Sequence, residues 1–331
     1  MKLSVFSVLL KDKPLSEVLD MLSEKGITHV EIGAGGFIGK EHCDPAMLLK
    51  NPDELKRFKD LLESKGITVG ALSCHGNPVH PQKQLAKEYH QDIKDAIDLA
   101  SKLGINRIVT FSGCPGDCED SKYPNWPVSP FPEDFQTVVE WQWEKKLIPY
   151  WKEMGQYAED KGVKVAMEMH GGYSVHTPYT AIKMRKETGC KSLGANLDPS
   201  HMWWQGIDPV KAVRYLSEED CLFYFHAKDA MIDPNYVSYY GLTDMQSFGV
   251  AYGRGWQFRT VGFGHDLKTW ADIFSTMRAC GYDDVVSIEH EDSYMSIEEG
   301  MEKAIANLRQ VMIFQPASAP KAFDIDNRFV E

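Results

Sequence analysis

The chain has 331 residues, 43% hydrophobic and 25% charged, which is the composition of an ordinary globular protein. Its formal net charge of −12 at pH 7 argues against nucleic acid as a partner, because phosphate contacts need clustered Lys and Arg and no basic run occurs. No apolar run approaches the roughly 20 residues that span a bilayer, and the apolar stretch 3–10 is too short for a signal peptide, so we expect a cytoplasmic protein without a membrane role.

Short β-rich apolar runs alternate with longer amphipathic stretches, the pattern of βα units around a parallel sheet. The predicted strands are 3–9, 29–32, 68–72, 107–111, 164–169, 192–197, 222–226 and 285–289. The predicted helices are 15–25, 52–65, 84–103, 135–161, 178–188, 209–216 and 267–280, with a last helix, 297–312, packed outside. Eight strands suit closure, so we predict an α/β fold of the (β/α)8 TIM-barrel type.

The length exceeds that of a usual domain, yet α/β barrels of this size form one unit with one core. We therefore predict a single domain over residues 1–314. The tail, 315–331, contains two prolines and no hydrophobic periodicity. It is predicted to be either disordered or an arm onto a neighbouring subunit.

Two long insertions interrupt the βα rhythm. Residues 113–132 follow the fourth strand and are rich in Gly, Pro and Cys, and residues 229–264 follow the seventh strand. Long loops in compact domains are usually functional, and loops after barrel strands line the active-site face. Cys114 and Cys118 suit half of a zinc site, with reduced, unligated thiols as the alternative. The second insertion carries the aromatic residues Tyr236, Tyr239, Tyr240, Phe248, Tyr252, Trp256 and Phe258.

Four predicted strands end in side chains that can bind a metal: Glu168, Asp198, His226 and Glu289. Taken alone, Asp198 suits a helix N-cap and His226 a hydrogen-bonded buried histidine. Strands of a closed barrel end on one face, however, and burying three carboxylates without a cation would be costly. The mixed oxygen and nitrogen set suits one divalent cation, which we expect to be Mn(II) before Mg(II), Co(II) or Zn(II).

The order Glu168, Asp198-x-x-His201, His226, Glu289 resembles the sugar isomerase and epimerase superfamily with the xylose-isomerase-like barrel. The resemblance covers almost the full chain. It implies that the four residues named above bind the metal and that both glutamates also move protons. It further implies that His201 holds a substrate oxygen.

A cation on a sugar carbonyl and a neighbouring hydroxyl would polarise the carbonyl and stabilise the enediolate formed when the α-proton leaves. Candidate bases are Glu168, Glu289 and His170, which follows Glu168 by two residues and so faces the same side of a strand. His170 precedes two glycines and has loop anchoring as its alternative role. His75, expected to follow the third strand, is either a substrate contact or a loop anchor.

The same proton abstraction serves isomerases, epimerases and lyases. Ketose 3-epimerases of the superfamily carry an Arg six residues after the metal-binding His, where this chain has Ile232. The run from His226 to Asp229, His-Ala-Lys-Asp, is similar to members that act on cyclic oxo-sugars, such as inosose dehydratases, and gives Lys228 a substrate-binding role. The aromatic insertion favours a flat ligand, although such residues also serve packing.

The chain also resembles the catalytic subunit of bacterial C-glycoside deglycosidases. This resemblance implies a lyase that releases an aromatic aglycone from 3-oxo-glucosyl C- or O-glycosides by β-elimination. It implies as partners the oxo-sugar or glycoside, a small second subunit and further copies of the chain. The alternative is an isomerase or epimerase of a free or phosphorylated sugar; Gly262-Phe263-Gly264 has no clear basic partner, which disfavours a phosphate.

Two other classes compete with these. A phosphodiesterase is one, because endonuclease-type repair enzymes share this barrel and bind three zincs, but the acidic charge and the lack of a basic groove count against it. A catalytically inactive scaffold is the other, and the intact ligand set counts against it.

Overall fold

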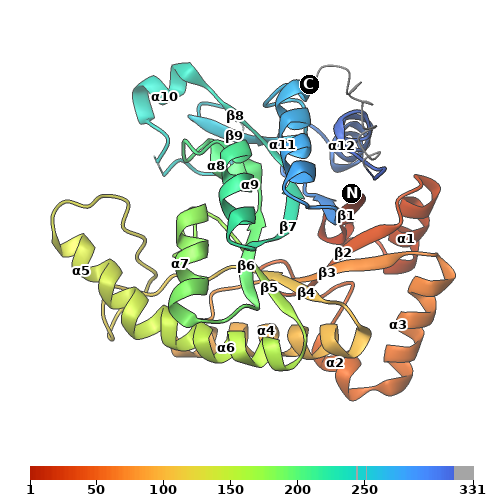
Figure 1. Ribbon diagram of the computed structural model, residues 1–331, viewed down its shortest axis with the longest axis horizontal. Coiled ribbons are helices and arrows are strands. Elements are labelled where there is room, and N and C mark those ends of the chain that lie inside the picture. The colour runs from red at the N-terminus through yellow and green to blue at the C-terminus, as the bar shows by residue number, and fades with distance from the viewer. Residues whose placement is uncertain (244, 251, 317–331) are drawn as a thin grey trace, which may run out of the picture.

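The computed structural model describes residues 1–316 apart from 244 and 251. Its eight parallel strands close into a barrel in the order β1-β10-β7-β6-β5-β4-β3-β2 (Figure 1). The strands are β1 (Lys2–Phe6), β2 (His29–Gly36), β3 (Thr68–His75), β4 (Arg107–Thr110), β5 (Lys164–Glu168), β6 (Leu193–Leu197), β7 (Leu222–Ala227) and β10 (Val285–Ile288). The predicted (β/α)8 TIM barrel is confirmed.

Helices surround this barrel (Figure 1). They are α1 (Leu15–Glu24), α2 (Pro45–Lys50), α3 (Pro52–Ser64), α4 (Lys83–Leu103), α5 (Asp134–Trp141), α6 (Ile148–Asp160), α7 (Pro178–Thr188), α8 (Pro199–Trp203), α9 (Pro209–Glu218), α10 (Pro234–Tyr240), α11 (Leu267–Ala279) and α12 (Ile297–Val311). In the described part of the chain, no helix combines the length and the apolar character needed to cross a membrane. The single domain over 1–314 stays a prediction, and the predicted tail lies outside the described residues from 317 onward.

Several predicted boundaries are wrong. The second strand runs on to Gly36 instead of ending at residue 32. The first strand ends at Phe6, and the apolar run continues through a 3-10 turn, Ser7–Leu10, because Leu10 is itself buried. The third strand runs on to His75 instead of ending at residue 72. The predicted helix 135–161 is α5 and α6 joined by a π-helical stretch, Gln142–Leu147. Pro149 follows that stretch and lacks the N–H that an α pattern would require there.

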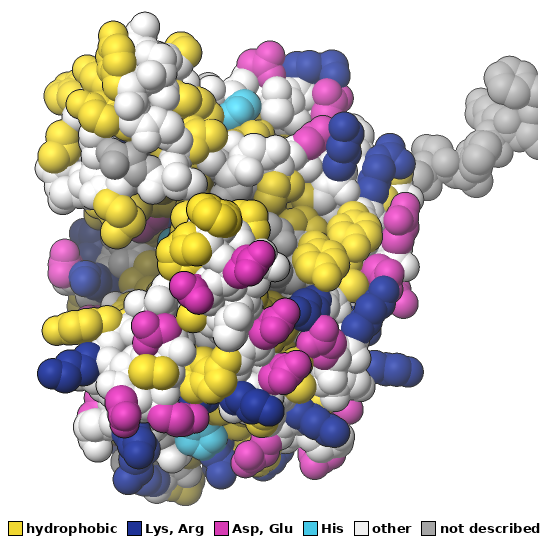
Figure 2. Space-filling view, turned by 90° about the vertical axis from the view of Figure 1, so that its left-hand side faces the viewer, with side chains coloured by type: hydrophobic (Ala, Val, Ile, Leu, Met, Phe, Trp, Pro, Cys, Tyr) yellow, Lys and Arg dark blue, Asp and Glu magenta, His cyan; other side chains and the backbone are white. Residues whose placement is uncertain are grey.

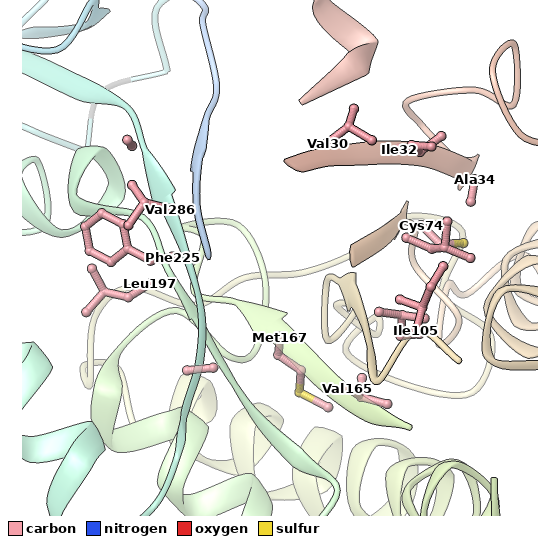
Figure 3. Close-up of a cluster of buried hydrophobic side chains, with 14 of the residues drawn as sticks. Val30, Ile32, Ala34, Cys74, Ile105, Val165, Met167, Leu197, Phe225 and Val286 are labelled. Carbon is pink, nitrogen blue, oxygen red and sulfur yellow. The ribbon is translucent and has the colours of Figure 1, made fainter. Parts of the chain in front are cut away.

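Strand β2 places apolar side chains outside the barrel and a polar one inside. Val30, Ile32 and Ala34 of β2 are buried in the main hydrophobic cluster, which lies between the strands and the helices (Figure 3). Glu31 lies between them in sequence and faces the interior, where it accepts a hydrogen bond from the Ser73 hydroxyl. Because side chains alternate along a strand, the outer face carries the packing and the inner face is free to carry polar chemistry.

The second insertion is not the irregular loop that the sequence predicts. It begins with β8 (Asp229–Ile232), which pairs antiparallel with β9 (Trp256–Arg259), and α10 lies between these two strands. Figure 2 shows hydrophobic side chains gathered over the lobe that holds α10, at the top of this face. The first insertion, 113–132, contains no helix or strand.

Asp229 fixes the base of the second insertion. Its carboxylate is fully buried and accepts hydrogen bonds from the backbone N–H groups of Gly262, Gly264 and His265 at 2.9, 3.1 and 3.0 Å. Two side chains also donate to it, His265 through Nδ1 at 2.9 Å and Trp270 through Nε1 at 3.1 Å. One side chain thus holds the two ends of the insertion together.

Replacing Asp229 with Asn is expected to lower the melting temperature by roughly 5 °C or more. The change removes the charge and one acceptor oxygen, which leaves buried donors unpaired at a cost of about 1–3 kcal/mol each. Asp272→Asn is the control, because Asp272 is exposed and only pairs with Lys268 on the surface. Equal melting temperatures for the two variants, measured by calorimetry, would contradict the anchoring role.

Candidate metal centre

The four predicted ligands meet at the carboxyl end of the barrel. Glu168 ends β5, Asp198 follows β6 and caps α8, His226 lies in β7, and Glu289 follows β10. One ligand atom from each lies within 4.8 Å of those of the other three. Three of the side chains are buried, and Glu289 is partly exposed. The structure therefore brings together the full set that the sequence predicts.

The atoms of this group fit a bound cation. His226 Nδ1, Asp198 Oδ2 and Glu289 Oε2 are sealed from solvent, and none makes a hydrogen bond with a described residue. His226 Nδ1 and Glu289 Oε2 approach to 3.0 Å without hydrogen-bond geometry. Leaving buried acceptors without a partner is costly, and a divalent cation would satisfy all three together.

Glu31 orients the histidine of this group, and the sequence analysis missed it. His226 Nε2 lies 3.0 and 3.1 Å from the two carboxylate oxygens of the fully buried Glu31. An Nε2–H that donates to Glu31 leaves the lone pair of Nδ1 facing the other ligands. Burial lowers the pKa of His226, but Glu31 and Glu168 together raise it well above its usual value. The sequence does carry a signal for Glu31, because a glutamate inside a short apolar strand is unusual and indicates a buried polar role.

Glu31→Gln is expected to weaken cation binding about 10–100-fold, because outer partners of a ligating histidine set its orientation and basicity. Calorimetric titration of the metal-free protein with Mn2+ and with Zn2+ measures this change. Glu63→Gln, an exposed glutamate on α3, should bind both ions as the unchanged protein does. Equal affinities for all three proteins would show that Glu31 has only a structural role.

Glu168 is the most heavily hydrogen-bonded of the ligands. It accepts from His75 Nε2 at 2.8 Å, from His201 Nε2 at 3.1 Å and from Asn196 Nδ2 at 3.4 Å. Burial raises the pKa of Glu168, but the hydrogen bond from His201 and the nearby His226 ring bring it well below its usual value. Such a carboxylate is a good ligand and a weak base. The His75 side chain therefore contacts Glu168 from the end of β3, while contacts of His75 and His201 with substrate stay predictions.

Lys228 places a positive charge beside the ligands. It is 1% exposed, and its Nζ lies 3.1 Å from Glu289 Oε1, 2.9 Å from Glu291 Oε2 and 3.3 Å from Asp198 Oδ2. Burial lowers the pKa of Lys228, but Glu289 and Glu291 raise it well above its usual value. Burial raises the pKa of Asp198 to about 7. Burial also raises the pKa of Glu289, but Lys228 and His226 bring it down to about 2.

His170 lies against this centre with one ring nitrogen engaged. Its Nδ1 donates to the Gly171 carbonyl, and its ring centroid is 4.0 Å from that of His201. Burial lowers the pKa of His170, which keeps the ring neutral. A neutral ring with its proton on Nδ1 carries a lone pair on Nε2. His170 thus contacts the loop through one nitrogen, and its role as a base stays a prediction.

The two cysteines of the first insertion have no further zinc ligands beside them in the described residues. Neither belongs to a group of three or more metal-capable side chains within the described ranges. The buried Cys114 thiol contacts the Asn125 carbonyl at 3.3 Å, and burial raises its pKa to about 12. The exposed Cys118 contacts the Ser121 hydroxyl. The alternative of reduced, unligated thiols fits these contacts.

Comparisons with known proteins agree with the fold. A family model described as xylose isomerase-like TIM barrel matches residues 19–311. The uncharacterised protein YfiH of Bacillus subtilis strain 168 is 35% identical over 317 residues, which cover 94% of this chain and 99% of that protein. The crystal structure of the probable 3-DHS dehydratase AsbF of Bacillus anthracis has a TM-score of 0.62 at 17% identity, covering 93% of this chain and 99% of that one. The IOLI protein, solved with a bound zinc atom, has a TM-score of 0.60 at 19% identity, covering 94% and 98%.

Proposed function

Because this chain belongs to the xylose isomerase-like TIM barrel family, we propose that it is a divalent-metal-dependent enzyme that removes a proton next to a sugar carbonyl. The observation that carries the proposal is the convergence of three carboxylates and one imidazole with unpartnered ligand atoms. Glu168, Asp198, His226 and Glu289 would hold the cation. When bound there, it would withdraw electrons from a carbonyl and so acidify the adjacent C–H bond.

The surrounding residues supply the remaining functions. His170 takes the proton through Nε2, while its bond to the Gly171 carbonyl keeps that nitrogen unprotonated beforehand. Lys228 lies within the same group of acids and stabilises negative charge that develops on a substrate oxygen. His201 contacts Glu168 through Nε2 and has a buried Nδ1 without a partner among the described residues, which suits a substrate oxygen.

We infer that the outcome is elimination from a 3-oxo-glucosyl C- or O-glycoside with an aromatic aglycone. His170 removes the proton at C2, the C1=C2 double bond forms, and the C1–aglycone bond breaks with its electron pair leaving on the aglycone, which then takes up a proton. Aromatic side chains near the centre support a flat leaving group: Phe258 lies 5.3 Å from the His201 ring, and Trp256 stacks on Trp204 at 4.7 Å. The Bacillus anthracis structure carries the name of a dehydratase, which is also an elimination enzyme.

The test is aglycone release. The Mn2+-loaded protein is incubated with an aryl 3-oxo-glucoside and the free phenol is measured, with the matched unoxidised glucoside as the control. We expect release only from the oxidised compound, loss of release with a chelator, and recovery when Mn2+ is restored. A panel of ketoses in deuterated water separates the alternative, because exchange with a new sugar and no release would indicate an isomerase or epimerase. If no compound gave either aglycone release or deuterium exchange, the proposed function would be refuted.

A further inference from the structure

Arg254 is a buried arginine without an acidic partner among the described residues. Its side chain is 7% exposed, and its guanidinium carbon lies 4.2 Å from the Phe248 ring centroid and 4.9 Å from that of Trp256. In the described part of the chain, it forms no salt bridge and its guanidinium donates no hydrogen bond. Its nitrogens are nevertheless not sealed from solvent. A covered arginine normally has a partner, because an unpaired buried charge is costly.

The segment that carries Arg254 spans the mouth of the barrel. At one end the Tyr252 ring stacks on Tyr294 at 5.3 Å, in the segment that follows β10 and its ligand Glu289. At the other end Phe258 of β9 meets the His201 ring edge-on at 5.3 Å. Arg254 lies between these two contacts in sequence. The segment therefore has contacts on both sides of Arg254 with residues beside the metal centre.

Two stacked rings connect Arg254 with Lys228. Lys228 Nζ lies 4.5 Å from the Phe258 centroid, Phe258 stacks with Phe248 at 5.9 Å and 10°, and Arg254 lies over Phe248. Acidic side chains neutralise Lys228, whereas no described acid faces Arg254. Burial lowers the pKa of Arg254, which agrees with a charge that lacks a partner.

We propose that Arg254 binds an anionic oxygen group, a carboxylate or a phosphate, on the aromatic part of the substrate. Because two rings lie between Lys228 and Arg254, the arginine faces the part of the substrate beyond the sugar; in this respect the inference rests on the proposed function. The flat faces of Phe248 and Trp256 hold the guanidinium so that its free N–H groups meet the anion in a fixed plane. The substrate class becomes glycosides of anionic aryl aglycones, such as hydroxybenzoates.

Binding of small aryl anions tests this without catalysis. Benzoate, phenyl phosphate and neutral benzamide are titrated at constant ionic strength by calorimetry and by tryptophan fluorescence, for which Trp256 is the adjacent reporter. We expect the unchanged protein to bind one of the anions at least tenfold more tightly than benzamide, and the preferred anion identifies carboxylate or phosphate as the group. Trp256→Phe should remove the fluorescence change while calorimetry still detects binding.

Arg254→Gln should abolish the preference for the anion, and Arg254→Lys should retain part of it through its charge. Arg57→Gln is the matched control, because Arg57 is exposed and pairs with Glu54 on α3. Melting curves confirm that each variant is folded. Equal binding of benzamide and both anions by the unchanged protein, or an anion preference that survives Arg254→Gln, would overturn the proposal. Anion binding at Arg254 without cleavage of any glycoside would instead remove the proposed function and leave this site standing.

Discussion

Glu289→Gln is expected to abolish turnover and to weaken binding of the divalent cation by at least about 100-fold. Losing an outer partner of a ligand already costs about 10–100-fold in metal affinity, and this change removes a charged ligand itself. Glu289 Oε2 has no hydrogen-bond partner among the described residues, and glutamine keeps the size of the side chain without its charge. Calorimetric titration with Mn2+ and the rate of aglycone release measure the two effects.

Glu298→Gln provides the control for this variant. Glu298 is exposed in the first turn of α12, a few residues after the loop that holds Glu289, so its replacement tests the chemical change without touching the centre. Its affinity and turnover should match those of the unchanged protein. Full turnover by Glu289→Gln in cation-free buffer would show that the converging side chains serve another purpose.

The barrel was predictable because its strands are buried on the outer face and read as short apolar runs between amphipathic helices. The ends of the elements were less predictable, since hydrophobicity marks burial and not backbone geometry. Leu10 is as well buried in a 3-10 turn as it would be in a strand. The β8–β9 pair was missed because α10 lies between its two strands. The sequence therefore has no tight-turn motif that would indicate a hairpin.

The convergence of the four candidate ligands was predictable because each is a titratable side chain at the end of an apolar strand. Their partners were not, because these contacts depend on which strands face each other across the barrel. Glu31 and His226 are 195 positions apart in sequence and meet inside it. The substrate contact of Lys228 stays a prediction, while its acidic neighbours Asp198, Glu289 and Glu291 come from the ends of two other strands. Spacing along one strand carries no information about such neighbours.

His170→Asn should separate proton transfer from cation binding. Asparagine keeps an N–H that can donate to the Gly171 carbonyl, so the loop remains anchored, but it offers no basic nitrogen. Loss of a general base typically lowers the rate by about 10²–10⁴-fold, and we expect a decrease of that size in aglycone release. Cation affinity should not change, because His170 is not among the four converging ligands.

His176→Asn is the matched control, since His176 lies in the same loop and contacts the Ser174 carbonyl instead of the ligand group. Its rate and its cation affinity should match those of the unchanged protein. If His170→Asn released aglycone at the same rate as the His176→Asn control, the base would have to be Glu168 or Glu289. A base role for Glu168 conflicts with the hydrogen bonds that this carboxylate accepts from His75 and His201. Glu289 would then be the remaining candidate.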